Sequence, residues 1–376
     1  MLGPVFLPYL NAPLADAPLT TPPELSVDIG SDTAAGKPVD VLMDTGSTGV
    51  VISLSHLDRF MDDTELVRKI ALATGTDAFG SLILDHKKLR KITYSSSGSE
   101  FYGIDVMRTI TVHGAALPDG STPQVTTRQI PVFVALEADC TSKARRCDTK
   151  KPVAMMGVGF AREVNGKSQD TPDRNPFLNL ITSPSGTDQG YVVTRTGVRI
   201  GISENESDKG LVVLPLTKST LFEKSGLVEY KPPHAFVSLN GGKETRVRLL
   251  IDTGVPDAFI SVPPSQSCNL FRTDPKTAQR VLLPDVPVTI RIGRRSGGSV
   301  SYAFKVDDKA PTTPSVVHLI GNISGPDANS CRTAAKPGQT EKRRLNTGLH
   351  ILNGYDYLFD YTAGSIAFRK IDGSSP

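Results

Sequence analysis

Apolar and polar residues alternate along most of the chain, in short runs rich in Val, Ile and Leu. Alternation with a period of two places one face of a β-strand in a core and the other in solvent. Clusters of Gly, Pro, Asn and Ser separate the runs, as turns between strands require. The predicted strands lie at residues 25–30, 39–43, 49–54, 110–114, 130–136, 191–202, 210–216, 235–239, 246–251, 286–292, 302–306 and 365–370.

Helical periodicity is scarce by comparison. Apolar residues recur every three or four positions in three segments, at 54–63, 65–75 and 276–283. The pattern as a whole predicts an all-β protein with a few short helices.

One pattern occurs twice. VDVLMDTGSTGVVIS at 39–53 and VRLLIDTGVPDAFIS at 247–261 both run from apolar residues into Asp-Thr-Gly and end in Ile-Ser. Their aspartates, Asp44 and Asp252, are 252 − 44 = 208 positions apart. Agreement in the tripeptide and in its flanks indicates an internal duplication. A chain of 376 residues is also longer than one hydrophobic core usually supports.

We therefore predict two similar lobes, at 1–204 and 205–376, with the charged segment 201–210 as the linker. A twofold relation between the lobes would bring the two aspartates face to face. Two carboxyl groups that close share a proton, because they cannot both ionise comfortably. One then acts as a base toward water, while the other donates a proton to a carbonyl or a leaving group.

The chain resembles the pepsin-like aspartic peptidases in five places that occur in the expected order. They are DTGS at 44–47, the flap-like KITYSSSGSEFYGIDVMRTITVHG at 91–114, MMG at 155–157, NPFLNL at 175–180 and YDYLFDYTAGSIAFRK at 355–370. The resemblance covers the chain from about Glu24 to its end. It implies a bilobal acid-protease fold, in which two pseudo-twofold-related, barrel-like β lobes flank a central cleft.

The same resemblance implies roles for individual residues. Asp44 and Asp252 are the expected catalytic dyad of an endopeptidase that hydrolyses a peptide or protein substrate bound in the cleft. Thr45 and Thr253 are expected to support the dyad. Substrate contacts are expected from the two loops and the flap, at Ser47, Gly46, Gly254, Tyr94, Ser97 and Gly98.

The second loop departs from the family pattern. Val255 and Pro256 follow its Asp-Thr-Gly, where the family usually has a hydroxyl that donates to the second aspartate. Loss of such a donor raises a carboxyl pKa, so we predict that Asp252 holds the shared proton and Asp44 is the base. The second hydrophobic pair before glycine is also replaced, by Asn-Thr-Gly at 346–348.

These departures leave two other functions open. One is acid–base catalysis by the same dyad on a bond other than a peptide bond. The other is non-catalytic binding of a peptide, a glycan or another protein between the lobes. Two intact aspartates favour catalysis, whereas the altered second loop favours the alternatives.

The four cysteines indicate two local disulfides. Cys140 and Cys147 bracket a short polar loop, while Cys268 and Cys331 both lie in the second half of the chain. Sequence alone permits three pairings, of which Cys140–Cys147 with Cys268–Cys331 needs no link between halves. Disulfides favour a secreted or other extracytoplasmic protein. No leader precedes the first predicted strand, so we expect it to be absent from this sequence.

Glycosylation sequons occur at Asn205 and Asn322, and they matter only in a secreted eukaryotic protein. Several function classes find no support. A net charge of +3 is too small to indicate nucleic-acid binding, and no apolar run is long enough to span a membrane. The six histidines have no metal-ligand spacing, and no phosphate-binding or dinucleotide-binding loop is present. We expect no metal and no cofactor. We also expect a monomer, because one chain supplies both aspartates.

Overall fold

The computed structural model describes most of the chain. The described residues are 4–14, 17–30, 37–57, 64–76, 82–84, 87–94, 96–141, 147–164, 167–168, 171–181, 187–202, 210–220, 228–267, 269–275, 279–293, 298–306, 313–318 and 343–371.

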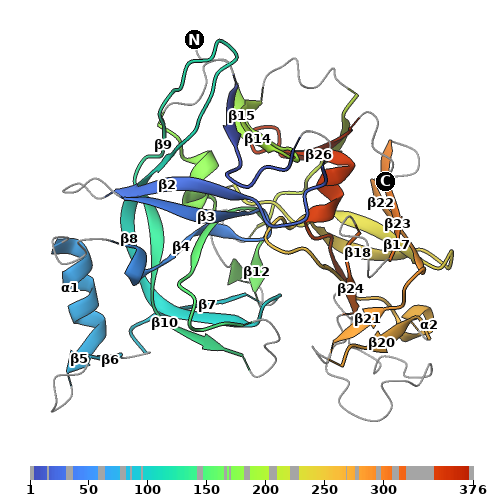
Figure 1. Cartoon of the computed structure of the whole chain (residues 1–376), viewed down its shortest axis with the longest axis horizontal. Coiled ribbons are helices and arrows are strands. Elements are labelled where there is room, and N and C mark those ends of the chain that lie inside the picture. The colour runs from blue at the N-terminus through green and yellow to red at the C-terminus, as the bar shows by residue number, and fades with distance from the viewer. Residues whose placement is uncertain are drawn as a thin grey trace.

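The molecule has two β-rich lobes joined by a third sheet (Figure 1). The first lobe, in blue to green, lies on the left of the view, and the second, in yellow to red, lies on the right. The bilobal, mostly β architecture confirms the fold predicted from the sequence. Among the described residues, no helix is long and apolar enough to cross a membrane.

The first lobe is built on one twisted sheet. Its strands follow the order β10-β4-β11-β3-β2-β8-β7, with β9 paired to β8. The bounds are β2 (Glu24–Gly30), β3 (Pro38–Asp44), β4 (Thr48–Ser53), β7 (Arg90–Tyr94), β8 (Ser99–Val112), β9 (Val125–Thr126), β10 (Ile130–Cys140) and β11 (Ala154–Val158).

The second lobe repeats this plan. Its strands follow the order β20-β21-β24-β19-β25-β18-β17-β22-β23. The bounds are β17 (His234–Leu239), β18 (Thr245–Leu250), β19 (Ala258–Ile260), β20 (Phe271–Thr273), β21 (Arg280–Leu282), β22 (Pro287–Gly293), β23 (Ser299–Lys305), β24 (Val316–His318) and β25 (Arg344–Asn346).

The third sheet takes strands from both halves of the sequence. Its order is β1-β15-β14-β26-β27-β16. The bounds are β1 (Val5–Pro8), β14 (Asp188–Val193), β15 (Gly197–Ile202), β16 (Val212–Pro215), β26 (Tyr355–Asp360) and β27 (Ser365–Lys370). The predicted boundary between residues 204 and 205 falls outside the described residues, so it stays a prediction.

The remaining elements are small. Two short ribbons pair β5 (Thr74–Thr76) with β6 (Leu82–Leu84), and β12 (Glu163–Val164) with β13 (Lys167–Ser168). The helices are α1 (Thr64–Ala73), α2 (Pro264–Ser267) and the 3₁₀ turns η1 (Leu54–His56), η3 (Pro172–Arg174), η4 (Pro176–Leu178) and η8 (Leu349–Asn353).

The helix predicted over 276–283 is wrong. Residues 280–282 form strand β21, in which Leu282 is buried and paired with Phe271 of β20. A run of three or four apolar residues fits either element, and here pairing within the sheet decides it.

The two similar sequence segments form strands that pair in the same way in both lobes. Val50 of β4 pairs in parallel with Val132, and its counterpart 208 positions later, Ala258 of β19, pairs in parallel with Val316. Likewise β11 lies between β3 and β4, as β25 lies between β18 and β19. The two aspartate loops are therefore set on equivalent frameworks.

Apolar burial explains why both frameworks form. Alternate residues of β2 and β3 are buried in the first lobe, as Leu25, Val27 and Val41 show. In the second lobe Val237 and Ile290 occupy the same kind of position. At about 25 cal/mol per Å² of buried apolar area, such side chains contribute about 1.5–3 kcal/mol each.

The lobes also pack on the joining sheet. Phe160, which follows β11, stacks on Phe359 of β26 with ring centroids 4.4 Å apart. Tyr191 of β14 packs edge-on against the same ring and donates its hydroxyl to the carbonyl of Val158. The sheet thus fixes the base of the first aspartate loop.

Candidate active site

Both Asp-Thr-Gly motifs occupy the turn between two neighbouring strands. Asp44 ends β3, and the chain reverses before β4. Asp252 follows β18 by two residues, and the chain enters β19 at Ala258. Each aspartate is only 5% exposed. A buried strand end therefore presents one carboxyl group from each lobe.

The two turns are joined by reciprocal hydrogen bonds between threonines. The backbone N–H of Thr45 donates to Oγ1 of Thr253 at 3.0 Å, and the N–H of Thr253 donates to Oγ1 of Thr45 at 3.1 Å. Each hydroxyl then donates onward across the interface, from Thr45 to the carbonyl of Ile251 at 2.9 Å and from Thr253 to that of Met43 at 2.7 Å. Through this network the two threonines connect the two loops.

The glycine of each motif leaves room for the aspartate of the other. A methyl group at Gly46 would lie 2.4 Å from Oδ1 of Asp252, and one at Gly254 would lie 2.7 Å from Oδ1 of Asp44. Neither separation is possible for a real side chain. The two carboxyl groups themselves lie within hydrogen-bonding reach of each other. The loops therefore bring together the two aspartates that the sequence paired.

The first carboxyl group is held by its own loop. Oδ1 of Asp44 accepts from the N–H of Gly46, and Oδ2 accepts from the hydroxyl of Ser47, both at 2.6 Å. Ser47 is 2% exposed. Gly46 and Ser47 were predicted as substrate contacts, but in the structure their polar groups contact Asp44.

The second carboxyl group has a donor that the sequence analysis missed. Oδ1 of Asp252 accepts from the N–H of Gly254 at 3.0 Å, and Oδ2 accepts from Nδ2 of Asn346 at 2.5 Å. The prediction that Val255 deprives Asp252 of its side-chain donor is wrong, because the amide of Asn346 donates from β25.

Strand register shows how Asn346 reaches this position. It pairs with Leu250 of β18, as Met155 pairs with Leu42 of β3 in the first lobe. Its own Oδ1 accepts from the N–H of Gly348 at 2.9 Å, which orients Nδ2 toward Asp252. The only sequence signal was that a polar residue occupies the place of a hydrophobic one.

The surroundings of Asp252 raise its pKa well above the usual value for an aspartate. Burial is the largest cause, followed by the charge of Asp44 and the hydrogen bond with it. The positive charge of Arg162 and the hydrogen bond from Asn346 oppose the increase. Burial and the charge of Asp44 are therefore the main causes of the raised pKa of Asp252, rather than a missing donor.

The flap-like hairpin is formed by β7 and β8. Tyr94 pairs with Ser99 at its tip, and the turn between them closes through the N–H of Gly98, which donates to the carbonyl of Tyr94 at 2.8 Å. Gly98 has a φ of 80°, which favours glycine. The hydroxyl of Ser97 donates to that of Ser99 at 2.9 Å.

Tyr94 packs in a small apolar cluster apart from the main core. Its partners include Val51 of β4, Ile92, Phe101 and Phe133. The ring of Tyr94 meets that of Phe101 edge-on, with centroids 5.9 Å apart. Because Val51 belongs to the strand that leaves the Asp44 turn, this cluster connects the flap to the first aspartate loop.

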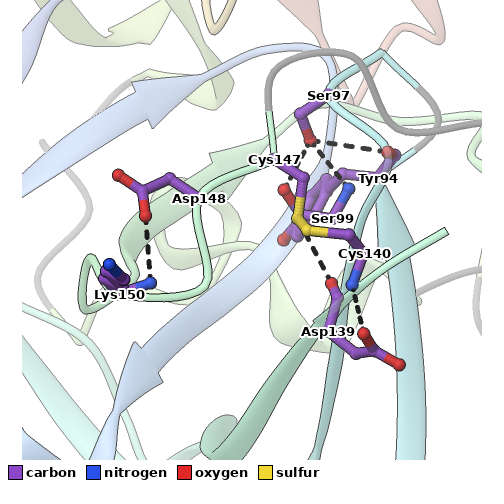
Figure 2. The surroundings of a disulfide bond; sticks show 8 residues. All are labelled: Tyr94, Ser97, Ser99, Asp139, Cys140, Cys147, Asp148 and Lys150. Carbon is purple, nitrogen blue, oxygen red and sulfur yellow. Dashed lines mark hydrogen bonds between the residues drawn. A yellow bond between two sulfur atoms is a disulfide. The ribbon is translucent and has the colours of Figure 1, made fainter.

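A disulfide lies beside the flap turn (Figure 2). Cys140, at the end of β10, pairs across the sheet with Ser99 and is bonded to Cys147. This confirms the first predicted disulfide. Cys268 and Cys331 lie outside the described residues, so their pairing stays a prediction.

The two sequons, at Asn205 and Asn322, also lie outside the described residues. Within the part of the chain that the structure describes, no group of three or more His, Cys, Asp or Glu could hold a metal ion.

Similarity to known proteins is found in the fold and not in the sequence. No family model matches the chain, and no curated protein sequence matches it. Among solved structures it is similar to an aspartic proteinase from Irpex lacteus, with a TM-score of 0.54 over 99% of this chain and 98% of that one. The sequence identity is 13%, so the likeness concerns the fold alone. The fold is pepsin-like.

The threonine network predicts a specific loss of stability. Thr253→Val keeps the size of the side chain but leaves the buried N–H of Thr45 and the carbonyl of Met43 without this partner. We expect the free energy of unfolding, measured by urea denaturation, to fall by about 2–4 kcal/mol. Thr253→Ser retains the hydroxyl, so its free energy of unfolding should fall by less than about 1 kcal/mol. Equal losses in the two variants would contradict a role for the hydroxyl.

Replacing Asn346 should raise the pKa of Asp252 further. Asn346→Leu removes the donor and keeps the size. A hydrogen bond to a charged group is worth about 1.5–3 kcal/mol, and about 1.36 kcal/mol moves a pKa by one unit. Because the pair titrates as one unit, we expect the upper limb of a pH–rate profile to move up by about one pH unit. Met155→Leu, at the equivalent place in the first lobe, is the control: its sulfur makes only a 3.6 Å contact with the hydroxyl of Ser47, so this change should move the limb far less.

The same Asn346 variant has a readout that does not depend on activity. A carboxyl group whose pKa is raised on folding stabilises the folded state. Its contribution is complete below the unfolded pKa of about 3.9 and is lost as the pH rises through the folded pKa. Between about pH 4 and neutral pH, the free energy of unfolding should therefore decrease more in Asn346→Leu than in the wild type. An identical pH dependence would argue against the Asn346 contact.

The disulfide predicts a local effect on the flap. Replacing Cys140 and Cys147 by Ser should lower the free energy of unfolding by about 2–3 kcal/mol, as expected for so short a closed loop. Because Cys140 pairs with Ser99, hydrogen exchange at Gly98 should also become faster than in the oxidised protein. Unchanged exchange at Gly98 would show that the flap turn does not depend on the disulfide.

Proposed function

We propose that the protein is an aspartic-type endopeptidase. One observation carries the proposal: two buried carboxyl groups, one from each lobe, lie within hydrogen-bonding reach of each other, and each has its own set of donors. The pepsin-like fold supports it. Such a pair holds one proton over a wide pH range, which gives one acid and one base at the same place.

The asymmetry of the pair suggests the role of each carboxyl group. Asp252, with its raised pKa, is the acid that protonates the carbonyl oxygen of the scissile peptide bond. Asp44, held by Gly46 and Ser47, is the base that takes a proton from the attacking water. Water oxygen bonds to the carbonyl carbon and forms a tetrahedral intermediate. The proton held by Asp44 then passes to the leaving nitrogen as the carbon–nitrogen bond breaks, and a hydroxyl of the intermediate returns its proton to Asp252, which leaves a carboxylic acid and restores the pair.

Other parts of the proposal concern the substrate and the compartment. The peptide would lie between the lobes, with the flap residues Tyr94, Ser97 and Gly98 closing over it and Gly254 beside it. A single chain supplies the whole dyad, so we propose a monomer. The disulfide between Cys140 and Cys147 supports an oxidising, extracytoplasmic compartment.

The altered second loop supports a second candidate. Val255 and Asn346 change the surroundings of Asp252 alone, so the dyad could serve another acid–base reaction, or the lobes could bind a peptide, glycan or protein without cleaving it. In that case a statine-type inhibitor would bind without any peptide being hydrolysed.

Both aspartates should be essential for peptide hydrolysis. We expect the wild type to cleave casein or a mixed peptide library between about pH 3 and pH 7 in a statine-sensitive manner, in line with a shared-proton dyad. Asp44→Asn and Asp252→Asn should each abolish cleavage, because each leaves only one titrating carboxyl group. Asp40→Asn, an exposed carboxylate four residues earlier on β3, is the control and should retain activity.

The outcomes separate the candidates. Near-normal hydrolysis by either dyad variant would rule out the dyad as the catalyst. Tight binding of the inhibitor to a folded wild type that cleaves nothing would replace the peptidase proposal with the second candidate.

A further inference from the structure

Three arginines lie near one another, and one of them, Arg162, acts on Asp252. Arg248 of β18 is the register partner of Arg344 of β25. Arg162, which follows β11 in the first lobe, acts electrostatically on both Asp252 and Arg344. Burial, and after it the charges of Arg162 and Arg248, lower the pKa of Arg344. We call Arg162, Arg248 and Arg344 the arginine cluster.

The strand pattern shows which face carries the cluster. Leu249 and Leu345 are buried in the core of the second lobe. Successive residues of a strand point to opposite faces, so Arg248 and Arg344 lie on the face turned away from that core. Asn346 shares this face, and its amide contacts the second aspartate. Two residues of a strand span about 7 Å, so Arg344 lies about the length of two extended substrate residues from Asn346, which contacts the dyad.

Arg162 is set against the second lobe by its neighbours. The N–H of Ala161 donates to Oε1 of Glu229, from the second half of the chain, at 3.3 Å. Ala161 has a φ of 60°, a left-handed conformation that is rare for a residue with a side chain. Nε of Arg162 is buried and has no hydrogen-bond partner in the described part of the protein. A buried donor of this kind calls for an acceptor.

A further arginine lies on the same sheet, since Arg246 is two residues from Arg248 on β18. His234 of β17 pairs with Arg248, and its pKa is lowered, mainly by burial and then by the charge of Arg246. Like charges directly opposite each other destabilise a sheet. Arg291 of β22, by contrast, has a carboxylate partner, since it donates a hydrogen bond to Glu244 at 2.7 Å. Within the described residues, no carboxylate forms an ion pair with a member of the arginine cluster.

We propose that the arginine cluster binds the carboxylate of an acidic substrate residue, so that the enzyme prefers peptides with Glu or Asp within about two residues of the scissile bond on the side of β18 and β25. This inference rests on the proposed function. Guanidinium groups bind carboxylates bidentately. A bound carboxylate would also relieve the repulsion between Arg248 and Arg344 and supply an acceptor for Arg162.

The test uses quenched fluorogenic peptides that differ only by Glu or Gln at each position flanking the scissile bond. At about pH 5.5, where a glutamate with a pKa of about 4.3 is ionised, we expect kcat/KM to be roughly tenfold higher for Glu at one or two positions, the ratio that about 1.4 kcal/mol produces. The preference should shrink in about 1 M salt, where the Debye length is about 3 Å. It should also shrink at about pH 3.5, where the glutamate is largely protonated.

Variants connect the preference to the cluster. Arg344→Gln and Arg248→Gln should each reduce the Glu-to-Gln ratio toward one, and Arg344→Glu should invert it in favour of a Lys peptide. Arg68→Gln is the matched control, because Arg68 is an exposed arginine on α1 at the far edge of the first lobe (Figure 1), and it should keep the wild-type ratio.

Peptide binding to Asp44→Asn, followed by fluorescence polarisation, separates this inference from the proposed function. Cleavage of Glu and Gln peptides at equal rates would overturn the inference and leave the peptidase intact. If the wild type cleaves nothing, tighter binding of Glu peptides that Arg344→Gln abolishes would support the arginine site alone. Equal binding of Glu and Gln peptides would overturn it.

Discussion

The hydrogen bonds between Thr45 and Thr253 are the constraint on which the candidate site depends. Each threonine receives an N–H from the opposite turn and donates to a carbonyl beyond it. These groups are buried, so losing any of them leaves a polar group without compensation by water. The network therefore admits one relative position of the two turns. That position brings two carboxyl groups together despite their mutual repulsion, and it excludes any side chain larger than hydrogen at Gly46 and Gly254.

Within this symmetric frame, the two lobes supply their aspartates differently. Asp44 takes its side-chain donor from its own turn, three residues along, whereas Asp252 takes it from β25, a strand 94 residues away. A hydroxyl can also accept a hydrogen bond, but an amide NH₂ can only donate. The contact from Asn346 therefore holds Oδ2 of Asp252 as an acceptor, as the N–H of Gly254 holds Oδ1. The amide of Asn346 thus replaces the hydroxyl that is missing at Val255, but this NH₂ group can only donate a hydrogen bond.

Much of this architecture could be predicted from the sequence, for physical reasons that differ between features. Period-two burial is local, so most strands were visible, and the spacing between Asp44 and Asp252 revealed the duplicated framework. The Asn346 contact was hidden because it depends on parallel pairing between strands far apart in the chain. Segment 276–283 was misread because so short an apolar run carries no period of its own. The arginine cluster was equally hidden, since its members meet only through register and through a chain crossing between lobes.

The charges around Asp252 show how the two halves cooperate. Burial and the neighbouring carboxylate raise the pKa of Asp252, while Arg162 and Asn346 limit the increase. Arg162 comes from the first lobe and Asn346 from the second, so neither lobe alone sets the proton affinity of the pair. A carboxyl pKa raised on folding makes the folded state bind the proton more tightly than the unfolded chain does, so the contribution of Asp252 to stability is greatest in acid and falls as the pH rises through that pKa. The protonation state that stabilises the fold is therefore also the one in which the pair has both an acid and a base.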